Sequence, residues 1–544
     1  MTDGATTDGA TTDGAMPPEN NRGPGEPQSD GFFAPGSEVR IHGLAKSFNE
    51  LSNRIPERVF AHTPEGPLTF GELSARADAM IAHLSTHGVR AGDRVVVMMR
   101  NSPASLALIF GLMRAGMIWV PTNPALVGDG LAHAIKLVEA AIVVCDPDLV
   151  ATIESCGATA ENGILPLAGL PPAVEHASLQ ERALAPDDLV ALMFTSGTTG
   201  PSKAVMVTHA MLELSAQAAA FCAGLRPGDN LYMWEPFYHI GGAQVIVMPL
   251  LHDIVVTLRD RFSASRFWAD VREAGCTHIH HLGGIIQILL KQPPSPLDRD
   301  HDVRIAWGGG CPADVWKAFE DRFGVQIREC YGMTESSSLT TCNTEGALGS
   351  VGRPLPWFTV TVKDETGKLL GAGEGRGEII VNTSLPAAIF PGYYRNPEAT
   401  AKALRDDGFH TGDLGSWNED GLLFFHGRMG DSIRCRGENV SSHEVESVAL
   451  HHPDVEECAM VGVPAEVGEY DIQLFVVRRK GSELKPDVLH AWLAGRLAPY
   501  QRPRYIAFVE AFPKTPSQRI QKHRLPQAPE GRWDSAAHTE RRKP

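Results

Sequence analysis

Helical and strand-like patterns alternate along the chain between about Ile41 and Cys145, and this alternation limits the fold more than any other feature of the sequence. Apolar residues recur either at helical spacing or in short uninterrupted runs. The patterns predict helices over Phe70–Leu84 and Leu106–Met113, and strands over Arg94–Met99, Met117–Pro121 and Ala141–Cys145. Alternating helices and strands form a mostly parallel sheet covered by helices, so the predicted class is α/β.

Length, charge and cysteine content narrow the class of protein further. A chain of 544 residues, 43% hydrophobic and 21% charged, is globular in composition and long enough for two or more cores. Its apolar runs fall short of the roughly 20 residues that a membrane helix needs, and its start lacks a signal-peptide pattern. A formal charge of −16 argues against a nucleic-acid surface. Nine cysteines without a C-x-x-C pair indicate neither a disulfide framework nor a zinc site, which favours a reducing compartment. Taken together, these features predict a cytoplasmic protein that binds neither membrane nor nucleic acid.

Both ends of the chain are polar and of low complexity. Residues 1–15 repeat Thr-Asp-Gly-Ala three times and continue into sequence rich in Pro, Gly and Asn, which predicts a disordered leader over residues 1–37. Met16 is an alternative start that the sequence does not decide. The polar, basic stretch 529–544 is likewise predicted to be a disordered tail.

A loop rich in Gly, Ser and Thr, Thr195–Lys203, follows the apolar run Leu189–Phe194. Glycines let backbone N–H groups approach a ligand, hydroxyls add donors, and Lys203 adds a positive charge, which together suit phosphate. The spacing is not that of a Walker P-loop. Composition alone leaves open a flexible surface loop between a strand and a helix.

Two further segments permit either a functional or a structural interpretation. Pro236–Gly242 follows the strand-like run Asn230–Trp234 and contains an aromatic pair, a histidine and two glycines, which can wall a ligand pocket or simply pack. The histidines His278, His280 and His281 suggest a metal site, but no carboxylate or thiolate follows them in the sequence. A structural role is therefore expected for these histidines.

Later motifs supply groups that suit a nucleotide. Trp307–Pro312 ends a strand with three glycines and offers a flat backbone surface. In Cys330–Glu335, Thr334 can hydrogen-bond a phosphate and Glu335 can hold a hard divalent cation. Asp413, in a glycine-containing turn, can accept hydrogen bonds from two ribose hydroxyls.

In their order along the chain, these motifs resemble the adenylate-forming (ANL) superfamily over about residues 45 to 527. The form Arg-Gly-Glu-Asn-Val-Ser is similar to the acyl-CoA ligase branch, including its crotonobetaine/carnitine-CoA-ligase-like members, rather than to peptide-synthetase adenylation domains. The resemblance rests on Thr195–Lys203, Phe237–Gly242, Tyr331–Glu335, Thr411–Asp413, Gly427–Asp431, Arg436–Glu444 and Pro513–Arg519.

The resemblance implies two domains and two chemical steps. A large multi-sheet N-terminal domain (38–429) would bind the adenylate and acyl groups, and a small mobile α+β C-terminal domain (430–528) would turn about a hinge at Gly430. In the first step a carboxylate attacks the α-phosphate of ATP, with Mg²⁺, and forms an acyl-adenylate and pyrophosphate. In the second step the thiol of CoA displaces AMP.

The resemblance also implies roles for individual residues. Catalytic roles would fall to Arg519, Thr334, Glu335, His239 and Lys203, with Glu335 as the metal ligand. Nucleotide would be bound by Thr195, Ser196, Gly197, Thr198, Thr199, Gly309, Gly310, Tyr331, Gly332, Asp413 and Arg428. The acyl pocket would be walled by Trp234, Tyr238, Trp307 and Met333, and the CoA tunnel by Arg436, Gly437, Glu438 and Asn439.

Two positions depart from the family pattern. The C-terminal signature normally ends in a lysine that neutralises charge between carboxylate and α-phosphate, and Arg519 stands there. The positive charge of arginine is spread over a planar guanidinium, so it cannot take the place of a compact ammonium between two oxyanions. Losing a positioned donor costs roughly 10²–10³ in rate. Lys522 would substitute only if its loop shifted. At the hinge, Gly430 replaces the usual Lys or Asp, which leaves rotation possible.

These departures predict an acyl-CoA ligase that transfers an acyl group from acyl-AMP to CoA but adenylates poorly or not at all, so that a separate adenylating enzyme would supply the intermediate. Alternatives are a conventional two-step ATP-dependent ligase, an adenylate-dependent amide or ester ligase, and a non-catalytic nucleotide-binding relic. Because the predicted pocket wall contains large aromatic residues and no obvious charged partner, we expect an apolar or aromatic acid, drawn from secondary metabolism.

Overall fold

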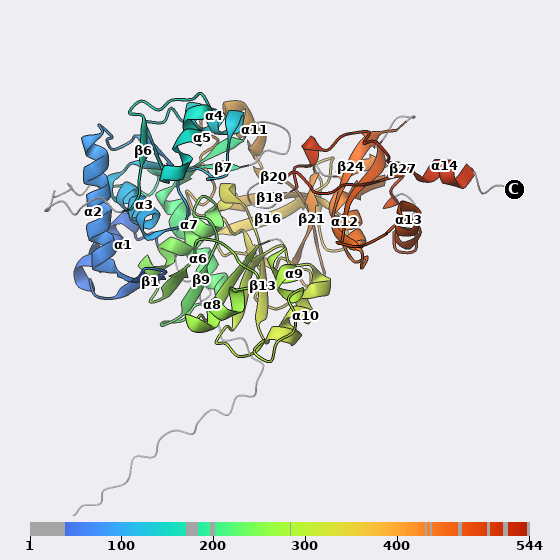
Figure 1. Cartoon of the computed structure of the whole chain (residues 1–544), viewed down its shortest axis with the longest axis horizontal. Helices are drawn as coiled ribbons and strands as arrows, with labels where there is room; N and C mark the ends of the chain where they lie inside the picture. Colours follow the sequence, from blue (N-terminus) through green and yellow to red (C-terminus); the bar gives the residue numbers. More distant parts are fainter. Residues whose placement is uncertain are drawn as a thin grey trace, which may run out of the picture. The chain divides into compact units, whose positions relative to one another are not determined.

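The structure is a computed structural model that describes residues 39–169, 183–195, 202–282, 284–429, 432–435, 438–465, 470–497, 501–514 and 520–540 (Figure 1). These residues form five sheets. The predicted leader, residues 1–37, lies outside the described residues. In the part of the chain that the structure describes, no helix is both long and apolar enough to cross a membrane.

The first sheet contains the predicted alternation of helices and strands. Its strand order is β6-β5-β3-β4-β7-β8, and every neighbouring pair is parallel except β7 with β8. The strands are β3 (Arg94–Met98), β4 (Ile118–Pro121), β5 (Ile142–Cys145), β6 (Ile164–Pro166), β7 (Leu189–Thr195) and β8 (Lys203–Thr208). The predicted strands and helices of this region are confirmed apart from their end residues.

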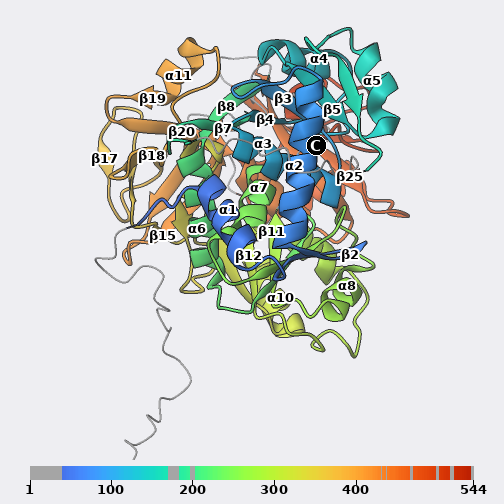
Figure 2. The same ribbon diagram turned by 90° about the vertical axis from the view of Figure 1, so that its left-hand side faces the viewer.

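Helices α1 (Leu44–Arg54), α2 (Phe70–Thr86) and α3 (Pro103–Ala115) pack against one another (Figure 2). Local sequence explains where two of them begin. The Thr69 side chain accepts a hydrogen bond from the backbone N–H of Glu72, and the Glu72 side chain accepts one from the backbone N–H of Thr69. This reciprocal pair is a capping box at the start of α2. Ser102 caps α3 in the same way, and Gly116 ends that helix in the left-handed conformation.

A nine-stranded sheet positions most of the predicted site. Its order is β15-β14-β13-β12-β11-β9-β10-β1-β2, and the strands from β13 to β1 run parallel. The carboxyl ends of β9, β11, β12 and β13 therefore meet at one edge, where ligands bind in open α/β sheets. The strands are β1 (Val59–Thr63), β2 (Gly66–Thr69), β9 (Asn230–Met233), β10 (Val255–Leu258), β11 (His278–Leu282), β12 (Ile305–Gly309), β13 (Gln326–Tyr331), β14 (Thr341–Cys342) and β15 (Arg353–Pro354).

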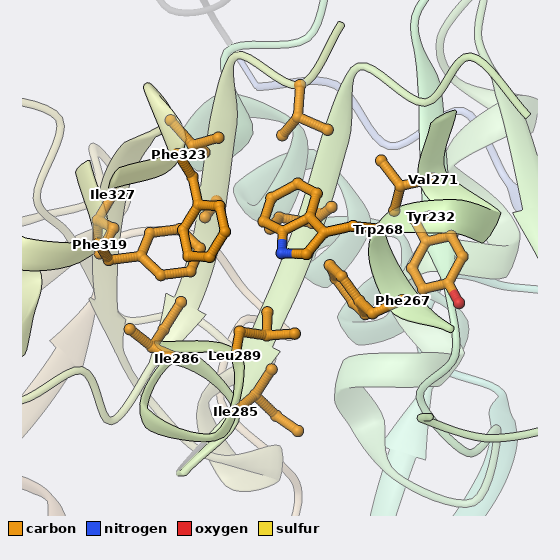
Figure 3. Packing of buried hydrophobic residues seen from close by; sticks show 14 of the residues in the cluster. Tyr232, Phe267, Trp268, Val271, Ile285, Ile286, Leu289, Phe319, Phe323 and Ile327 are labelled. Atoms are coloured by element: carbon orange, nitrogen blue, oxygen red, sulfur yellow. The ribbon is translucent and has the colours of Figure 1, made fainter. Parts of the chain in front are cut away.

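Aromatic side chains fill the space between this sheet and its helices α8 (Phe267–Glu273), α9 (Ile285–Leu290) and α10 (Ala313–Phe323) (Figure 3). The rings of Trp268 and Phe323 stack with centroids 4.6 Å apart. Each large apolar side chain buried in this way contributes about 2 kcal/mol relative to exposure. This core fixes β9, β11, β12 and β13 beneath the edge where the predicted site residues lie.

The third sheet is antiparallel and brings the second half of the predicted nucleotide site into register. Strand β20 pairs with β21, and Asp413 lies opposite Arg428. The strands are β16 (Phe358–Lys363), β17 (Leu369–Leu370), β18 (Gly377–Thr383), β19 (Leu404–Arg405), β20 (Gly408–Trp417) and β21 (Leu423–Arg428). The remaining helices before residue 430 are α4 (Gly128–Leu137), α5 (Val150–Ser155), α6 (His209–Ala223), α7 (Ile240–Val247) and α11 (Pro397–Ala403), with short 3₁₀ turns at Pro147–Leu149, Met248–Leu250 and Thr334–Ser336.

The C-terminal part contains a two-stranded and a four-stranded sheet. Its elements are β22 (Ser432–Cys435), β23 (Glu438–Ser441), α12 (Ser442–Leu450), β24 (Val455–Pro464), β25 (Tyr470–Arg478), α13 (Pro486–Ala494), β26 (Tyr505–Phe508), the 3₁₀ turn Lys522–Arg524, β27 (Trp533–Asp534) and α14 (Ser535–Glu540).

The expectation of a disordered tail from residue 529 was wrong for its described part. β27 pairs antiparallel with β26, opposite Tyr505 and Ile506. Trp533 packs against the C-terminal core, and the Arg532 guanidinium lies 3.9 Å from the Tyr505 ring centroid. The aromatic anchor, the strand pairing and the ion pair of Asp534 with Arg504 together hold this segment, and its polar composition gave no sign of them.

Candidate functional site

Tyr331, Asp413 and Arg428, all predicted to bind nucleotide, lie together. The Tyr331 hydroxyl donates to Asp413 Oδ2 at 2.8 Å, and Arg428 Nε lies 2.9 Å from Asp413 Oδ1. Asp413 is only 2% exposed. Burial, together with the charge of Asp413, raises the pKa of Tyr331 well above its usual range, so the phenol stays a donor. One carboxylate thus orients an aromatic ring and a guanidinium from two different sheets.

The turn Gly308–Gly310 is shaped by its lack of side chains. A Cβ on Gly308 would collide with the carbonyl oxygen of His281, and Gly310 has a positive φ of 96°. Glu329, which the sequence analysis did not single out, accepts hydrogen bonds from the backbone N–H groups of Gly310 and Cys311. Glu329 therefore holds the backbone at Gly310, which is predicted to bind nucleotide.

Glu329 and the neighbouring His281 are both neutral near pH 7. Burial raises the pKa of Glu329 to about 8, and burial lowers the pKa of His281 to about 3. His281 Nε2 lies 3.8 Å from Glu329 Oε2. The carboxyl group acts here as a hydrogen-bonding scaffold for backbone rather than as a charge.

Thr334 and Glu335 lie in a strained turn after β13. Ser337 and Ser338 both have positive φ, at 52° and 70°, and a Cβ on Gly332 would collide with the carbonyl oxygen of Ser338. Such backbone conformations cost about 1–3 kcal/mol each and are concentrated at functional sites. The buried Glu335 is further fixed by Tyr393, whose hydroxyl donates to Glu335 Oε1 at 2.9 Å.

The surroundings of Glu335 fit the predicted Mg²⁺. Among the described residues, nothing is hydrogen-bonded to Glu335 Oε2, and no three His, Cys, Asp or Glu side chains are grouped as a protein-only metal site. Mg²⁺ is usually bound by one or two carboxylates together with phosphate oxygens and water. One buried carboxylate with an unused oxygen matches that pattern.

The ends of the predicted phosphate loop are held side by side. Thr195 closes β7 and pairs in antiparallel register with Lys203, the first residue of β8. The loop therefore joins two strands, and the helix α6 begins only at His209. Lys203 Nζ lies 4.5 Å from the ring centroid of Tyr393. Ser196, Gly197, Thr198 and Thr199 lie outside the described residues.

The predicted acyl side is organised around His280. The Trp234 indole N–H donates to the carbonyl oxygen of His280 at 3.1 Å, and the rings of Trp307 and His280 lie 4.2 Å apart between centroids. Glu235 Oε2 is 2.6 Å from His280 Nδ1. Two predicted wall residues, Trp234 and Trp307, thus both contact His280, which was not predicted to line the acyl pocket and which is itself next to Glu235.

The other residues of the predicted acyl side come from two separate segments, one before α7 and one after β13. Tyr238 and His239 directly precede α7, with ring centroids 4.6 Å apart. Burial raises the pKa of Tyr238 to about 12. Met333 is half-buried and directly precedes the Thr334 turn.

The three histidines of β11 do not converge on one point. Each faces a different carboxylate: Asp229 directly precedes β9, Glu235 follows β9, and Glu329 belongs to β13. The nearest nitrogen–oxygen distances are 3.7 Å for His278 to Asp229, 2.6 Å for His280 to Glu235 and 3.8 Å for His281 to Glu329.

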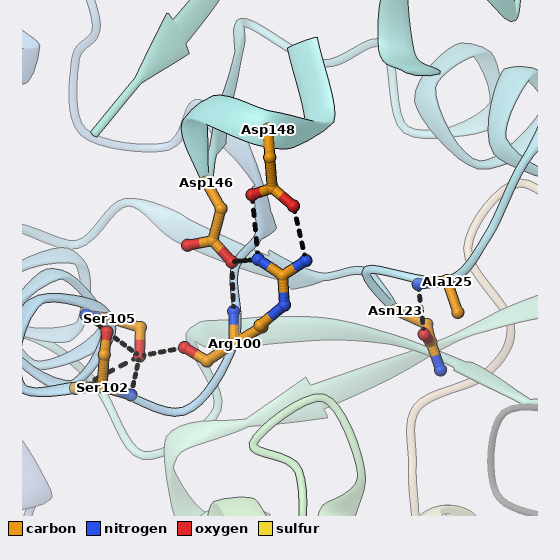
Figure 4. Close-up of polar contacts among 7 residues, drawn as sticks. All are labelled: Arg100, Ser102, Ser105, Asn123, Ala125, Asp146 and Asp148. Atoms are coloured by element: carbon orange, nitrogen blue, oxygen red, sulfur yellow. Dashed lines mark hydrogen bonds and ion pairs between the residues drawn. The ribbon is translucent and has the colours of Figure 1, made fainter. Parts of the chain in front are cut away.

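Asn101 connects the first sheet to the segment that carries His239. Its amide nitrogen donates to the carbonyl oxygen of Glu235 at 2.8 Å, and its amide oxygen accepts from the N–H of Phe237. The preceding Arg100 is held by Asp146 and Asp148, at 2.8 and 2.7 Å, beyond the ends of β3 and β5 (Figure 4). These contacts fix where the chain leaves β9 and enters α7.

Several predicted residues of the C-terminal part lie outside the described residues, namely Gly430, Arg436, Gly437 and Arg519, together with the side chains of Glu438 and Asn439. Lys522 is described. Its Nζ lies 2.8 Å from Glu446 Oε1 and donates to Ser442 Oγ at 2.7 Å. Both partners belong to α12, so Lys522 takes part in the internal structure of the C-terminal part.

Glu235, Glu329 and Tyr393 are contacts that sequence reasoning missed. Glu329 left a signal, because strand alternation places it on the buried face with Ile327 and Tyr331. Glu235 left one too, as a lone charge between Trp234 and Pro236 in a largely apolar run. Tyr393 left none, because its link to Glu335 spans 58 positions in the sequence.

A large α/β domain of several sheets followed by a smaller C-terminal domain is the architecture of adenylate-forming enzymes. The family model described as AMP-binding enzyme matches residues 48–394, and that of the AMP-binding enzyme C-terminal domain matches residues 444–519. The chain belongs to this family of AMP-binding enzymes, within the ANL superfamily, and is an acid–thiol ligase of the AMP-forming type.

Relatives and solved structures agree with this assignment. The chain is 32% identical to long-chain fatty acid transport protein 1 of Homo sapiens, over 89% of this chain and 82% of the relative. It is 31% identical to crotonobetaine/carnitine–CoA ligase of Salmonella paratyphi A, over 80% and 89%. ATP-bound MatB from Rhodopseudomonas palustris superposes with a TM-score of 0.78 at 30% identity, over 88% and 97%.

Proposed function

We propose that this enzyme transfers an acyl group from an acyl-adenylate to CoA and is weak or inactive in forming the adenylate from ATP. One observation carries the proposal beyond the sequence. Lys522, the lysine nearest to Arg519, is bound to Glu446 and Ser442. Using it in place of the family lysine would break a partly buried ion pair and leave the Glu446 carboxylate without this cation.

In the proposed reaction the CoA sulfur attacks the acyl carbon of the adenylate. The C–S bond forms as the bond between that carbon and the phosphate oxygen breaks, AMP leaves with the electron pair, and the thiol proton is released. Asp413 and Arg428 hold the ribose, Tyr331, Gly309, Gly310 and Gly332 border the adenine, and Thr334 contacts the phosphate. These contacts would fix the adenylate while the thiol approaches along Arg436–Asn439.

The loop Thr195–Thr199 with Lys203 would hold the phosphates of ATP, and Glu335 would hold Mg²⁺ when ATP is bound. When bound, the cation neutralises charge on the phosphates. His239 would face the acyl carboxylate. We also propose the domain limits 38–429 and 430–528 with Gly430 as the hinge, a separate adenylating enzyme as partner, and a cytoplasmic location.

A conventional two-step ligase is the second candidate. The contact between Tyr393 and Glu335, and the position of Lys203 beside the same ring, favour it, because both would serve the ATP-dependent step. A protein that never binds ATP would have no need of them. The two candidates differ only in how well Arg519 replaces a lysine.

The two half-reactions can be measured separately with a panel of carboxylic acids. Acid-dependent ATP–pyrophosphate exchange reports the first step, and acyl-CoA formation from synthetic acyl-adenylates reports the second. We expect the wild type to form thioester without appreciable exchange, and Arg519→Lys to raise exchange by roughly 10²-fold with little change in thioester formation.

Arg524→Lys is the matched control, since Arg524 receives the same change a few residues away, where its side chain bonds locally to Gln521. It should leave both half-reactions unchanged. Exchange in the wild type as fast as in Arg519→Lys would show a conventional two-step ligase. Transfer from the adenylate to an amine or alcohol instead of CoA would show an amide or ester ligase.

A further inference from the structure

Glu235 and His280 form a polar pair within aromatic surroundings at the predicted acyl side. Their side chains are 2.6 Å apart, and the two residues are 2% and 7% exposed. Trp234 and Trp307, two predicted walls of the acyl pocket, both contact His280. The pair is therefore attached directly to the wall that would meet the acyl chain.

The fold does not need the Glu235–His280 pair for its stability, because apolar contacts could replace it. Desolvating two polar groups is costly, and well-packed apolar residues in their place are often as stable or more so. The ends of β9 and β11 are already joined by the bond from Trp234 to the His280 carbonyl and by strand register. Stability alone thus gives little reason for the pair.

The backbone makes room for the pair. A Cβ on Gly241, in the first turn of α7, would collide with both carboxylate oxygens of Glu235. A glycine at this position lets the carboxylate lie against the start of the helix that follows His239. His239, which directly precedes this turn, is proposed to face the reacting carboxylate, so the pair would lie close to where the acyl chain begins.

The hydrogen-bonding capacity of the pair is not exhausted. His280 Nδ1 and Glu235 Oε2 lie 2.6 Å apart, yet neither atom makes a hydrogen bond of good geometry with any described residue, and His280 Nε2 is hydrogen-bonded to none of them either. On α7, Gln244 is 1% exposed, and its Oε1 has no hydrogen-bond partner among the described residues. Buried polar atoms normally have partners, so a ligand group is a natural partner for these.

We propose that the Glu235–His280 pair selects acids whose acyl part carries an oxygen-bearing hydrogen-bonding group, foremost a hydroxyl, over the corresponding hydrocarbon acids. The hydroxyl bonds to His280 Nε2, whose ring is oriented by Glu235. A hydrocarbon acid of the same shape leaves that nitrogen without a hydrogen-bond partner, which a site built for hydrogen bonding penalises strongly. The inference rests on the proposed function, and it replaces the expectation of a purely apolar acid.

Matched acyl-adenylates test this preference without any mutation. Thioester formation from 4-hydroxybenzoyl-AMP is compared with benzoyl-AMP, and 3-hydroxyoctanoyl-AMP with octanoyl-AMP. We expect kcat/KM to favour the hydroxylated member of at least one pair by about 10- to 100-fold. Equal rates, or a preference for the hydrocarbon member in both pairs, would overturn the proposal.

A double variant then assigns the preference to the pair. Glu235→Met with His280→Leu removes both polar groups together, so that no buried group is left unpaired, and it should bring the ratio to about one. The matched control is His278→Leu, the same substitution two residues earlier on the strand, where the side chain bonds to the carbonyl oxygen of Ala223. It should keep the wild-type ratio. A preference that survives in the double variant contradicts the assignment.

Binding measurements separate this inference from the proposed function. Unreactive acyl-sulfamoyl adenosines with the same acyl pairs are titrated calorimetrically into the wild type and the double variant. If no thioester forms from any adenylate, the proposed transfer to CoA fails, while the affinity ratio still decides the role of the pair. An affinity ratio near one in the wild type overturns the inference even if transfer is rapid.

Discussion

His280 and His281 are neighbours on β11, and each meets a buried glutamate, yet the two contacts differ in kind. His280 lies 2.6 Å from Glu235 on the acyl side, whereas His281 lies 3.8 Å from Glu329 on the nucleotide side. The Glu329 carboxyl group instead accepts hydrogen bonds from backbone N–H groups, and burial raises its pKa to about 8. The same two residue types thus form a side-chain pair in one place and a neutral support for backbone in the other.

Separation and backbone geometry account for the difference. Successive strand residues point to opposite faces, so the two histidines meet different partners. Gly241 lets the Glu235 carboxylate come close, whereas Glu329 is already committed to the amides of Gly310 and Cys311. The buried carboxylates of this enzyme therefore have to be read contact by contact, since residue type does not decide their role.

Breaking the Glu235–His280 pair on one side should have the largest effect. Glu235→Ala leaves His280 buried without its partner, and we expect about 3–5 kcal/mol less free energy of unfolding. Urea denaturation followed by circular dichroism measures it. Glu235→Met with His280→Leu should instead stay within about 1 kcal/mol of the wild type. A single variant as stable as the double variant would mean that the pair is not energetically coupled.

Glu329→Gln should change how the free energy of unfolding depends on pH, and so sharpen the comparison by testing whether Glu329 is neutral. The folded pKa of about 8 lies above the ordinary 4.5, so the unfolded chain loses this proton first as pH rises. The stabilising contribution is complete below pH 4.5 and is lost as pH approaches 8, while His281, with its pKa lowered to about 3, stays neutral. The amide keeps the acceptor for Gly310 and cannot ionise.

The wild type should therefore lose a few kcal/mol more than Glu329→Gln between about pH 5 and pH 8.5, as measured by urea denaturation at each pH. Parallel stability profiles for the two proteins would show that Glu329 is already ionised at the lower pH.

Gly241→Ala should disturb the acyl side alone. The added methyl group would meet the Glu235 carboxylate, and overpacking of this kind costs about 1–3 kcal/mol. Thermal unfolding measures the loss. Gly284→Ala is the control, since among the described residues a Cβ there meets only the Gln287 side chain, at 3.8 Å. Equal losses in both variants would remove the special role of Gly241.

Tyr393→Phe should have the smallest effect and concerns a third buried carboxylate. It removes the hydroxyl that donates to Glu335 and keeps the ring beside Lys203. We expect ATP affinity in the presence of Mg²⁺ to fall about 10-fold, with little change in its absence, as measured by calorimetry. Tyr394→Phe serves as the control. A loss of the same size without Mg²⁺ would place the effect on the fold.

Local patterns in the sequence predicted much of the frame and almost none of the contacts between frame elements. The alternation from Phe70 to Cys145 was sufficient to predict strands β3, β4 and β5 of the first sheet, because periodicity reports burial directly. The ordered motifs anticipated that Tyr331, Asp413 and Arg428 would belong to one site. Glu235 with His280 was not predictable, because 45 positions separate them and only the parallel register of β9 and β11 brings their ends together.

The pairing of β27 with β26 has a practical consequence for handling this protein. A chain shortened after Ala528 would leave β26 as the outer strand of its sheet, with unpaired N–H and C=O groups where Trp533 and Asp534 now bond. Exposed edges of that kind attract other chains and promote aggregation. An affinity tag is therefore better appended beyond Glu540 than substituted for the last sixteen residues.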